Sequence, residues 1–267
     1  RISKLMRGLR GKTALVSAAS SGIGKGIAKV LASEGCQVHI FSRNLDRIKE
    51  SAAEIEKETS NQVTFSAGDL SKAEDMRRIV GEVRKSRGTI DFLVMNYGDP
   101  KVAPFFDISD SDWDTSINMI LKSTIFLTRE FLPDMVKRRF GRVIFVTSLT
   151  TKQPMENFAI SASLRAAVVA LSKVLSLEFS QFGITFNSIS QGYIMTPRLE
   201  SIAARNAAAL NQSIEKAYDN MMQGIPSKRF GRPEEIGNLV SYLCSDDASY
   251  INGANIQIDG GLVRFPF

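Results

Sequence analysis

Short apolar runs rich in β-branched residues alternate with amphipathic segments along the whole of this 267-residue chain. The runs of strand length are 13–18, 37–42, 62–67, 90–96, 141–148, 184–190 and 254–259. Most are apolar at successive positions, which is typical of strands that helices cover on both faces. Strand–helix–strand repetition requires right-handed crossovers, which produce a parallel, doubly wound sheet. Because no linker rich in proline or glycine divides the chain, the pattern predicts a single α/β domain over residues 1–267.

Two segments depart from this alternation. Residues 191–230 are rich in alanine, leucine and methionine, and they follow the sixth predicted strand. An insertion beside the carboxyl ends of the strands predicts a helical lid over a substrate, and a packing or oligomer helix is the alternative. The basic segment 1–8 is interpreted as an N-terminal extension, with Met6 as the natural start.

Composition limits the partners of the chain. The net charge is +6, but the basic residues are scattered apart from the cluster KRRFGR at 137–142. A solvated helix end explains this cluster better than nucleic acid does. The N-terminal segment lacks the apolar core and cleavage site of a secretory signal, and no apolar run approaches the roughly 20 residues that cross a bilayer. The sequence therefore predicts a cytoplasmic protein without a nucleic-acid or membrane partner.

The two cysteines and the one histidine offer little metal or nucleophile chemistry. Cys36 and Cys244 are far apart in apolar contexts and are interpreted as buried free thiols. His39 lies inside a predicted strand and is interpreted as a structural residue. Without a second histidine or a CxxC motif, a zinc site or a Ser-His-Asp triad has no basis, so no metal is predicted.

A glycine-containing turn joins the first predicted strand to a helix. In SAASSGIGKGIA, Gly22 and Gly24 follow the strand and open the helix, which is the context of a dinucleotide-binding motif. Absent side chains let the backbone approach a diphosphate, and the helix N-terminus supplies free N–H groups and partial positive charge. At the end of the second strand, Arg43 stands where an acidic residue would bind the ribose of NAD, and Arg47 is near. A cation there favours NADP over NAD, with a solvated arginine as the alternative.

Several further motifs follow in order along the chain. They are SSGIG at 20–24, GDLS at 68–71, MNYG at 95–98, VTS at 146–148 and INGANIQIDGG at 251–261. With them the chain resembles the short-chain dehydrogenase/reductases over nearly its whole length, and most of all their 3-oxoacyl-carrier-protein reductase-like branch. The resemblance implies a Rossmann-type domain with a seven-stranded parallel sheet, assembled as a homotetramer or a dimer. It also implies hydride transfer between NAD(P) and a small carbonyl or alcohol substrate.

The resemblance also implies which residues bind the cofactor. The turn after the first strand would form the phosphate loop, and the end of the second strand would meet the ribose phosphate. Residues after the third and fourth strands would border the adenine and a ribose, and two residues after the sixth strand would hold the nicotinamide carboxamide. The implied residues are Ser17, Ser20, Ser21, Gly22, Ile23, Gly24, Arg43, Asp69, Leu70, Asn96, Gly98, Arg165, Ile194 and Thr196.

The catalytic positions implied by the resemblance are altered. Ser148 matches the family's serine, which hydrogen-bonds the substrate oxygen. The family places a tyrosine thirteen residues later and a lysine four residues after that, and here these positions hold Ser161 and Arg165. The segment AAVVALSK at 166–173 supports this register, because it resembles the family's helix after its lysine. Further departures replace the first loop glycine, an asparagine and a proline by Ala18, Ile120 and Gln191.

Loss of the phenol leaves proton transfer to be reassigned. A phenol titrates near 10, whereas a serine hydroxyl is a far weaker acid, so Ser161 cannot inherit the role. Arg165 lies on the same helix face and can bind ribose hydroxyls, but it does not give up a proton at neutral pH. The candidate replacement is Lys152, in the loop SLTTKQP. The alternatives are Tyr97, Tyr193 and a bound water, with Arg165 stabilising the oxyanion.

Three functions are compatible with these residues. The sequence favours an NADP(H)-dependent oxidoreductase with a divergent active site, and the alternative is a catalytically silent nucleotide-binding sensor or partner subunit. A third is non-redox chemistry like that of halohydrin dehalogenases, which pair an arginine with a tyrosine and lack a working nucleotide site. The glycine loop and Arg43 argue against it here. Lys101, Lys152 and Arg198 near the expected cleft suit an acidic substrate, with surface solvation as the alternative.

Overall fold

The computed structural model describes residues 8–265. Its strands form a seven-stranded sheet in the order β3-β2-β1-β4-β5-β6-β7, and all neighbouring strands are parallel. After β3 the chain crosses to the other side of β1, so the sheet is doubly wound, as predicted. This Rossmann-type arrangement opens a crevice at the carboxyl ends of β1 and β4. The strands are β1 (Thr13–Ser17), β2 (Gln37–Ser42), β3 (Val63–Ala67), β4 (Phe92–Met95), β5 (Gly141–Val146), β6 (Ile184–Gln191) and β7 (Asn255–Ile258).

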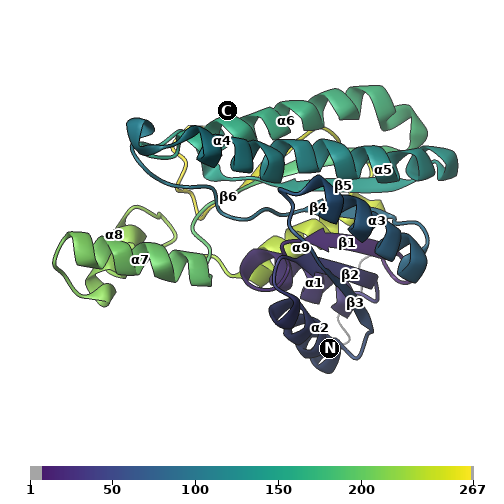
Figure 1. The fold of residues 1–267 in the computed structure, drawn as a ribbon, viewed down its shortest axis with the longest axis horizontal. Helices are drawn as coiled ribbons and strands as arrows, with labels where there is room; N and C mark the ends of the chain where they lie inside the picture. Colours follow the sequence, from purple (N-terminus) through teal and green to yellow (C-terminus); the bar gives the residue numbers. More distant parts are fainter. Residues whose placement is uncertain (1–7, 266–267) are drawn as a thin grey trace.

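Helices cover both faces of the sheet (Figure 1). One face is covered by α1 (Gly22–Ser33), α2 (Leu45–Thr59) and α9 (Pro233–Cys244), and the other by α3 (Ala73–Arg87), α5 (Ser123–Arg138) and α6 (Ala159–Phe179). Successive strand residues point to opposite faces. In β1, Ala14 and Val16 therefore enter the first core, whereas Leu15 enters the second. Two buried faces explain why the strands are apolar at consecutive positions.

The predicted insertion contains two helices, α7 (Pro197–Ala209) and α8 (Ile214–Gln223), which stand apart at the left of Figure 1. They pack on each other through small side chains, Ala203 and Ala207 against Ala217. Thr196 caps α7 by accepting a hydrogen bond from the Leu199 N–H at 3.3 Å. Of the predicted N-terminal extension 1–8, residues 1–7 lie outside the described residues.

Helix α6 differs from the expectation that no apolar segment has the length of a membrane span. With the turn that follows it, Ala159–Phe182, it meets the criterion by length and composition, at a mean hydropathy of 1.5. Serines interrupt the apolar residues of α6 in the sequence, so no continuous apolar run reveals the length of this helix. Its inner side packs Ile160, Leu164 and Val168 into the core beside the sheet. It is therefore a core helix of this domain.

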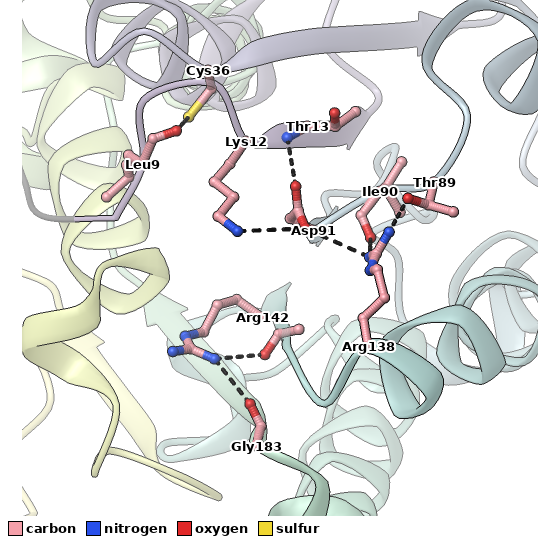
Figure 2. A network of polar contacts seen from close by, with 11 residues as sticks. Leu9, Lys12, Thr13, Cys36, Thr89, Ile90, Asp91, Arg138, Arg142 and Gly183 are labelled. Atoms are coloured by element: carbon pink, nitrogen blue, oxygen red, sulfur yellow. Dashed lines mark hydrogen bonds and ion pairs between the residues drawn. The ribbon is translucent and has the colours of Figure 1, made fainter.

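At the amino ends of the strands, on the side of the sheet opposite the crevice, polar contacts join β1, β4 and α5 (Figure 2). The backbone N–H of Thr13 donates to one carboxylate oxygen of Asp91 at 3.0 Å. Lys12 and Arg138 lie 4.0 and 3.5 Å from the other oxygen. Arg138 also donates to the Ile90 carbonyl at 2.6 Å. These contacts fix the starts of the two strands whose far ends flank the crevice.

The cysteines and the histidine are structural, as predicted. Both cysteines are buried free thiols, and Cys36 donates to the carbonyl of Leu9 at 3.4 Å (Figure 2). Burial raises the pKa of Cys36 to about 12, which leaves it unreactive. The ring nitrogens of His39 each lie 2.9 Å from a hydroxyl, those of Thr64 and Ser66. Burial lowers the pKa of His39 to about 4, so its ring is neutral at pH 7.

Candidate active site

A cavity of about 550 Å³ lies at the carboxyl ends of the strands and is lined by residues from the loop after β1 to α7. It coincides with the crevice that the strand order opens, where ligands of doubly wound folds bind. Most residues implied by the sequence meet there, although they are scattered from β1 to α7. Those that line it are Ser20, Ser21, Gly22, Ile23, Arg43, Asp69, Leu70, Asn96, Gly98, Ser148, Ser161, Arg165, Ile194 and Thr196.

Two residues of the expected phosphate loop support it from behind and do not line the cavity. The hydroxyl of Ser17 donates to the Asn96 carbonyl at 2.7 Å and accepts from the Asn96 N–H at 2.9 Å. Ser17 thereby ties the end of β1 to the end of β4. Gly24 is buried, and a Cβ added to it would lie 2.4 Å from the carbonyl oxygen of Ala18. Its lack of a side chain lets α1 pack closely against the loop.

Lys152, the predicted replacement acid, also lies outside the cavity lining. A 3-10 turn, Leu149–Thr151, precedes it and is capped by the Ser148 side chain, which accepts from the Thr150 N–H at 3.2 Å. This turn presents Leu149 and Thr150 to the cavity instead. Lys101 is outside as well, because its ammonium is held by Asp112 at 2.8 Å. Neither lysine is placed to donate a proton to a ligand in the cavity.

The start of α1 fits a diphosphate. The N-cap residue Ser21 makes no side-chain hydrogen bond to the first N–H groups, and the first turn contains no acidic residue. These N–H groups and the helix dipole are therefore available to an anion. Gly22 has a φ of +55°, which favours glycine, and a Cβ there would press on the Thr196 methyl group at 3.2 Å. Ala18, in place of the expected glycine, also adopts a left-handed φ of +49°.

Arg43 and Arg47 line the cavity together with Asn44. The Asn44 side chain caps α2 by accepting from the Arg47 N–H at 2.9 Å, which fixes the backbone between the two arginines. Both arginines are exposed, and within residues 8–265 neither is joined to a carboxylate. Two unpaired guanidinium groups at the end of β2 fit an additional phosphate better than they fit bare ribose hydroxyls.

Hydroxyl groups gather on the cavity wall between β5 and α6. Ser148 follows β5, and the Thr150 hydroxyl lies 3.5 Å from the hydroxyl of Ser161 on α6. All three residues line the cavity. They can hydrogen-bond a ligand oxygen, but none of them titrates near neutral pH. Thr150 adds a hydroxyl to this wall that the sequence analysis did not predict. The only signal for it in the sequence is its position in the loop after Ser148.

Arg165 brings a buried cation to the same wall. Its side chain is 7% exposed, and Nη1 donates to the Val146 carbonyl at 3.1 Å. Its Nε has no hydrogen-bond partner in the part of the chain that the structure describes. The guanidinium carbon lies 5.5 Å from the centre of the Tyr97 ring. Burial lowers the pKa of Arg165, but an arginine stays protonated in proteins.

The tyrosines that line the cavity are poor proton donors. Tyr97 is 6% exposed, and its hydroxyl is 2.6 Å from that of Thr124 on α5. Burial raises the pKa of Tyr97 and that of Tyr193. A raised pKa makes a phenol a weaker acid, so neither is suited on electrostatic grounds to the role of the tyrosine that the family resemblance implies.

The other departures are placed around this wall. Ile120 is fully buried in a π-helical segment, Ile117–Lys122, between α4 (Asp110–Ser116) and α5. A hydrocarbon therefore fills the position of the family's amide. Gln191 ends β6 and lines the cavity. From the insertion, Arg198 of α7 also lines it, and its Nε lies 3.6 Å from Asp99 after β4.

Comparisons with known proteins agree over nearly the whole chain. A family model described as enoyl-(acyl carrier protein) reductase matches residues 17–263. Oxidoreductase UcpA of Salmonella typhimurium is 35% identical over 257 residues, which is 95% of this chain and 95% of that protein. Human dehydrogenase/reductase SDR family member 4 is 32% identical over 95% of this chain and 88% of that protein.

Solved structures share the fold. L-sorbose reductase from Gluconobacter frateurii, complexed with NADPH and L-sorbose, superimposes with a TM-score of 0.92 at 29% identity, covering 98% of this chain and 100% of that one. A variant of actinorhodin polyketide ketoreductase with NADPH has a TM-score of 0.91 at 27% identity, covering 97% of this chain and 100% of that one. Both are reductases solved with a nicotinamide dinucleotide.

Proposed function

Because the chain belongs to the short-chain dehydrogenase/reductase family of oxidoreductases, we propose that it is an NADP(H)-dependent enzyme that interconverts a carbonyl and an alcohol at a divergent active site. One observation carries the proposal. A single cavity joins the free start of α1, the unpaired Arg43 and the wall that bears Ser148 and Arg165. A nucleotide and a small substrate can therefore share one cavity.

The preference for NADP(H) rests on the end of β2. Arg43 and Arg47 carry positive charge there and line the cavity with Asn44, whereas Asp46 between them lies outside the lining. An additional ribose phosphate would gain charge-assisted hydrogen bonds, whereas NADH would leave these cations without a partner. Solved relatives that bind NADPH are consistent with this choice.

In the proposed reaction, side chains of this protein hold and polarise the substrate. Bound in the cavity, the nicotinamide would supply or accept the hydride. Ser148, Thr150 and Ser161 present hydroxyls to the reacting oxygen, and Arg165 adds a positive charge on the same wall. Donors aimed at a developing oxyanion stabilise the transition state.

The proton must then come from water, because no cavity-lining side chain is suited to give it. Reduction adds hydride to the carbonyl carbon, while a water protonates the oxygen and the hydroxide left behind is neutralised by solvent. Serine in place of a phenol at position 161 leaves room for such a water. Lys152 could serve only if its loop moved, since it does not line the cavity.

A silent nucleotide-binding protein is the second candidate, and Ser161 is the observation that favours it. Without a phenol, the hydroxyls near the reacting centre are weak acids. Binding and turnover therefore have to be measured separately.

Assembly with further copies of the chain is part of the proposal. Helix α6 exposes Val174 and Leu177, the latter at 71%, and α6 is an otherwise apolar helix. Apolar side chains on one helix face favour burial against a second copy. Location in the cytoplasm and the absence of nucleic-acid and membrane partners stay predictions.

The test is a calorimetric titration of the purified protein with NADPH and with NADH. A screen of sugars, hydroxyacids and acyl thioesters follows, in both directions of the reaction. We expect NADPH to bind more tightly than NADH, and at least one substrate class to turn over. Nucleotide binding without any turnover would favour the silent protein. If neither nucleotide binds, both candidate functions are wrong.

A further inference from the structure

We propose that Tyr97 is a positioning residue for Arg165, and that its ring, anchored by Thr124, holds the guanidinium in the orientation that the active site uses. The inference rests on the proposed function in one respect, since it takes Arg165 to contact the bound nucleotide. We call this arrangement the clamp. The Tyr97 ring and the Val146 carbonyl contact the guanidinium, and the hydroxyl pair of Tyr97 and Thr124 holds the ring in place.

Few contacts fix the end of the Arg165 side chain. One hydrogen bond, from Nη1 to the Val146 carbonyl at 3.1 Å, holds it on the side of β5. Nε has no partner in residues 8–265, and no carboxylate forms an ion pair with the guanidinium there. The Tyr97 ring, 5.5 Å from the guanidinium carbon, is a second contact that restrains it, and the negative charge of Asp99 also acts on the guanidinium from farther away. A desolvated cation beside an aromatic face is attracted by the ring quadrupole.

The ring is itself held in place. Its hydroxyl is 2.6 Å from the Thr124 hydroxyl, and Thr124 donates to the Ile120 carbonyl at 2.6 Å. All three residues are buried, so these bonds are not exchanged with solvent. The hydroxyl of Tyr97 is thus used for anchoring, which agrees with the conclusion that this phenol is not the proton donor.

The clamp shows how the fold accommodates an arginine at position 165. The family's lysine is a compact charge, whereas the longer Arg165 carries a planar fork that stacks on rings. A chain of contacts runs from Arg165 on α6 through the Tyr97 ring and Thr124 to the backbone carbonyl of Ile120 in the π-helical segment. An arginine at this position therefore needs the ring that stands opposite it.

A double-mutant cycle tests the clamp. NADPH dissociation constants are measured for the wild type, Tyr97→Leu, Arg165→Met and the double variant, with Tyr97→Phe as the variant that keeps the ring. We expect Tyr97→Leu to weaken binding about 2- to 12-fold, the range for immobilising one long side chain on binding. Tyr97→Phe keeps the ring but loses the hydroxyl that anchors it to Thr124, so it should weaken binding less than Tyr97→Leu does. In the Arg165→Met background, Tyr97→Leu should have no further effect.

The matched control is Phe131→Leu, which removes a ring from the same core cluster but lies outside the cavity. Its NADPH affinity should be that of the wild type, and melting temperatures verify that every variant is folded. If Tyr97→Leu weakens binding equally with and without Arg165, the ring is merely structural and the clamp is wrong.

A nucleotide-free readout separates this proposal from the proposed function. In isotope-labelled protein, the Nε–H signal of Arg165 is the one that disappears in Arg165→Met. We expect it to shift and to exchange faster with water in Tyr97→Leu, and to shift less in Tyr97→Phe, which keeps the ring but loses its anchor. An unchanged signal in Tyr97→Leu overturns the clamp whether or not a nucleotide binds. Failure of the wild type to bind either nucleotide overturns the proposed function alone.

Discussion

Replacing Arg43 by glutamine should remove the preference for NADPH and leave NADH binding intact. The guanidinium is exposed, and within the described chain it has no ion pair to break before it meets a phosphate. Two unit charges 4 Å apart attract by about 1 kcal/mol in water and about 4 kcal/mol at a protein surface. Because Arg43 is open to solvent, the lower half of this range applies. About 1.5–2 kcal/mol corresponds to a 10- to 30-fold weaker binding of NADPH.

Calorimetric titrations of Arg43→Gln with NADPH and NADH, at low and high salt, measure this effect. The loss should shrink as salt rises, since the interaction is exposed and screened. Arg77→Gln is the matched control, because Arg77 is also exposed but lies on α3 outside the cavity. Equal weakening of both nucleotides would show that Arg43 supports the loop and does not read the phosphate. If neither nucleotide binds more weakly to the variant, Arg43 does not contact the bound nucleotide.

Three further predictions concern stability and assembly. Ala18→Gly should stabilise the fold by about 0.5–1 kcal/mol in urea unfolding, because it relieves a left-handed φ of +49° at the cost of some chain entropy. An unchanged urea midpoint would show that the backbone at Ala18 is not strained. The pKa of His39 is about 4 in the fold against 6.5 as its ordinary value, so the unfolded chain binds the proton first on acidification. Between pH 7.5 and 4.5 the wild type should therefore lose about 2–3 kcal/mol more than His39→Asn, measured by urea unfolding, and parallel losses would contradict the burial argument. Leu177→Glu, at a position 71% exposed, should convert the assembled species to a smaller one in light scattering, and an unchanged mass would exclude this face as the contact.

The glycine turn and the alternation of strands were sufficient to predict the sheet and the end of the cavity that the turn lines. Each right-handed crossover returns the chain to the amino side of the sheet, so every parallel strand ends at the same carboxyl side, where the loops that follow the strands meet. The strand β2 lies at 37–42 as predicted, and the others differ by a few residues at their ends. Arg43 lines the cavity for the same reason, because it follows β2, which pairs in parallel with β1 and ends at the same side of the sheet.

The catalytic end could not be predicted in the same way. Whether Lys152 reaches a ligand depends on a single 3-10 turn after Ser148, and its backbone directs Leu149 and Thr150 to the cavity instead. Nothing in the sequence marks Thr124 as the partner of Tyr97, because the two residues are brought together by packing between the β4 loop and α5.

The sequence by itself therefore determined the doubly wound sheet and the place of the glycine turn after its first strand, since these depend on residue type and short-range spacing. The phosphate-binding role of that turn and the loss of the phenol stay predictions. Only the tertiary structure decided which hydroxyls share a wall and what restrains Arg165. A buried cation takes its orientation from whichever carbonyls and rings surround it, and those come from segments distant in the chain.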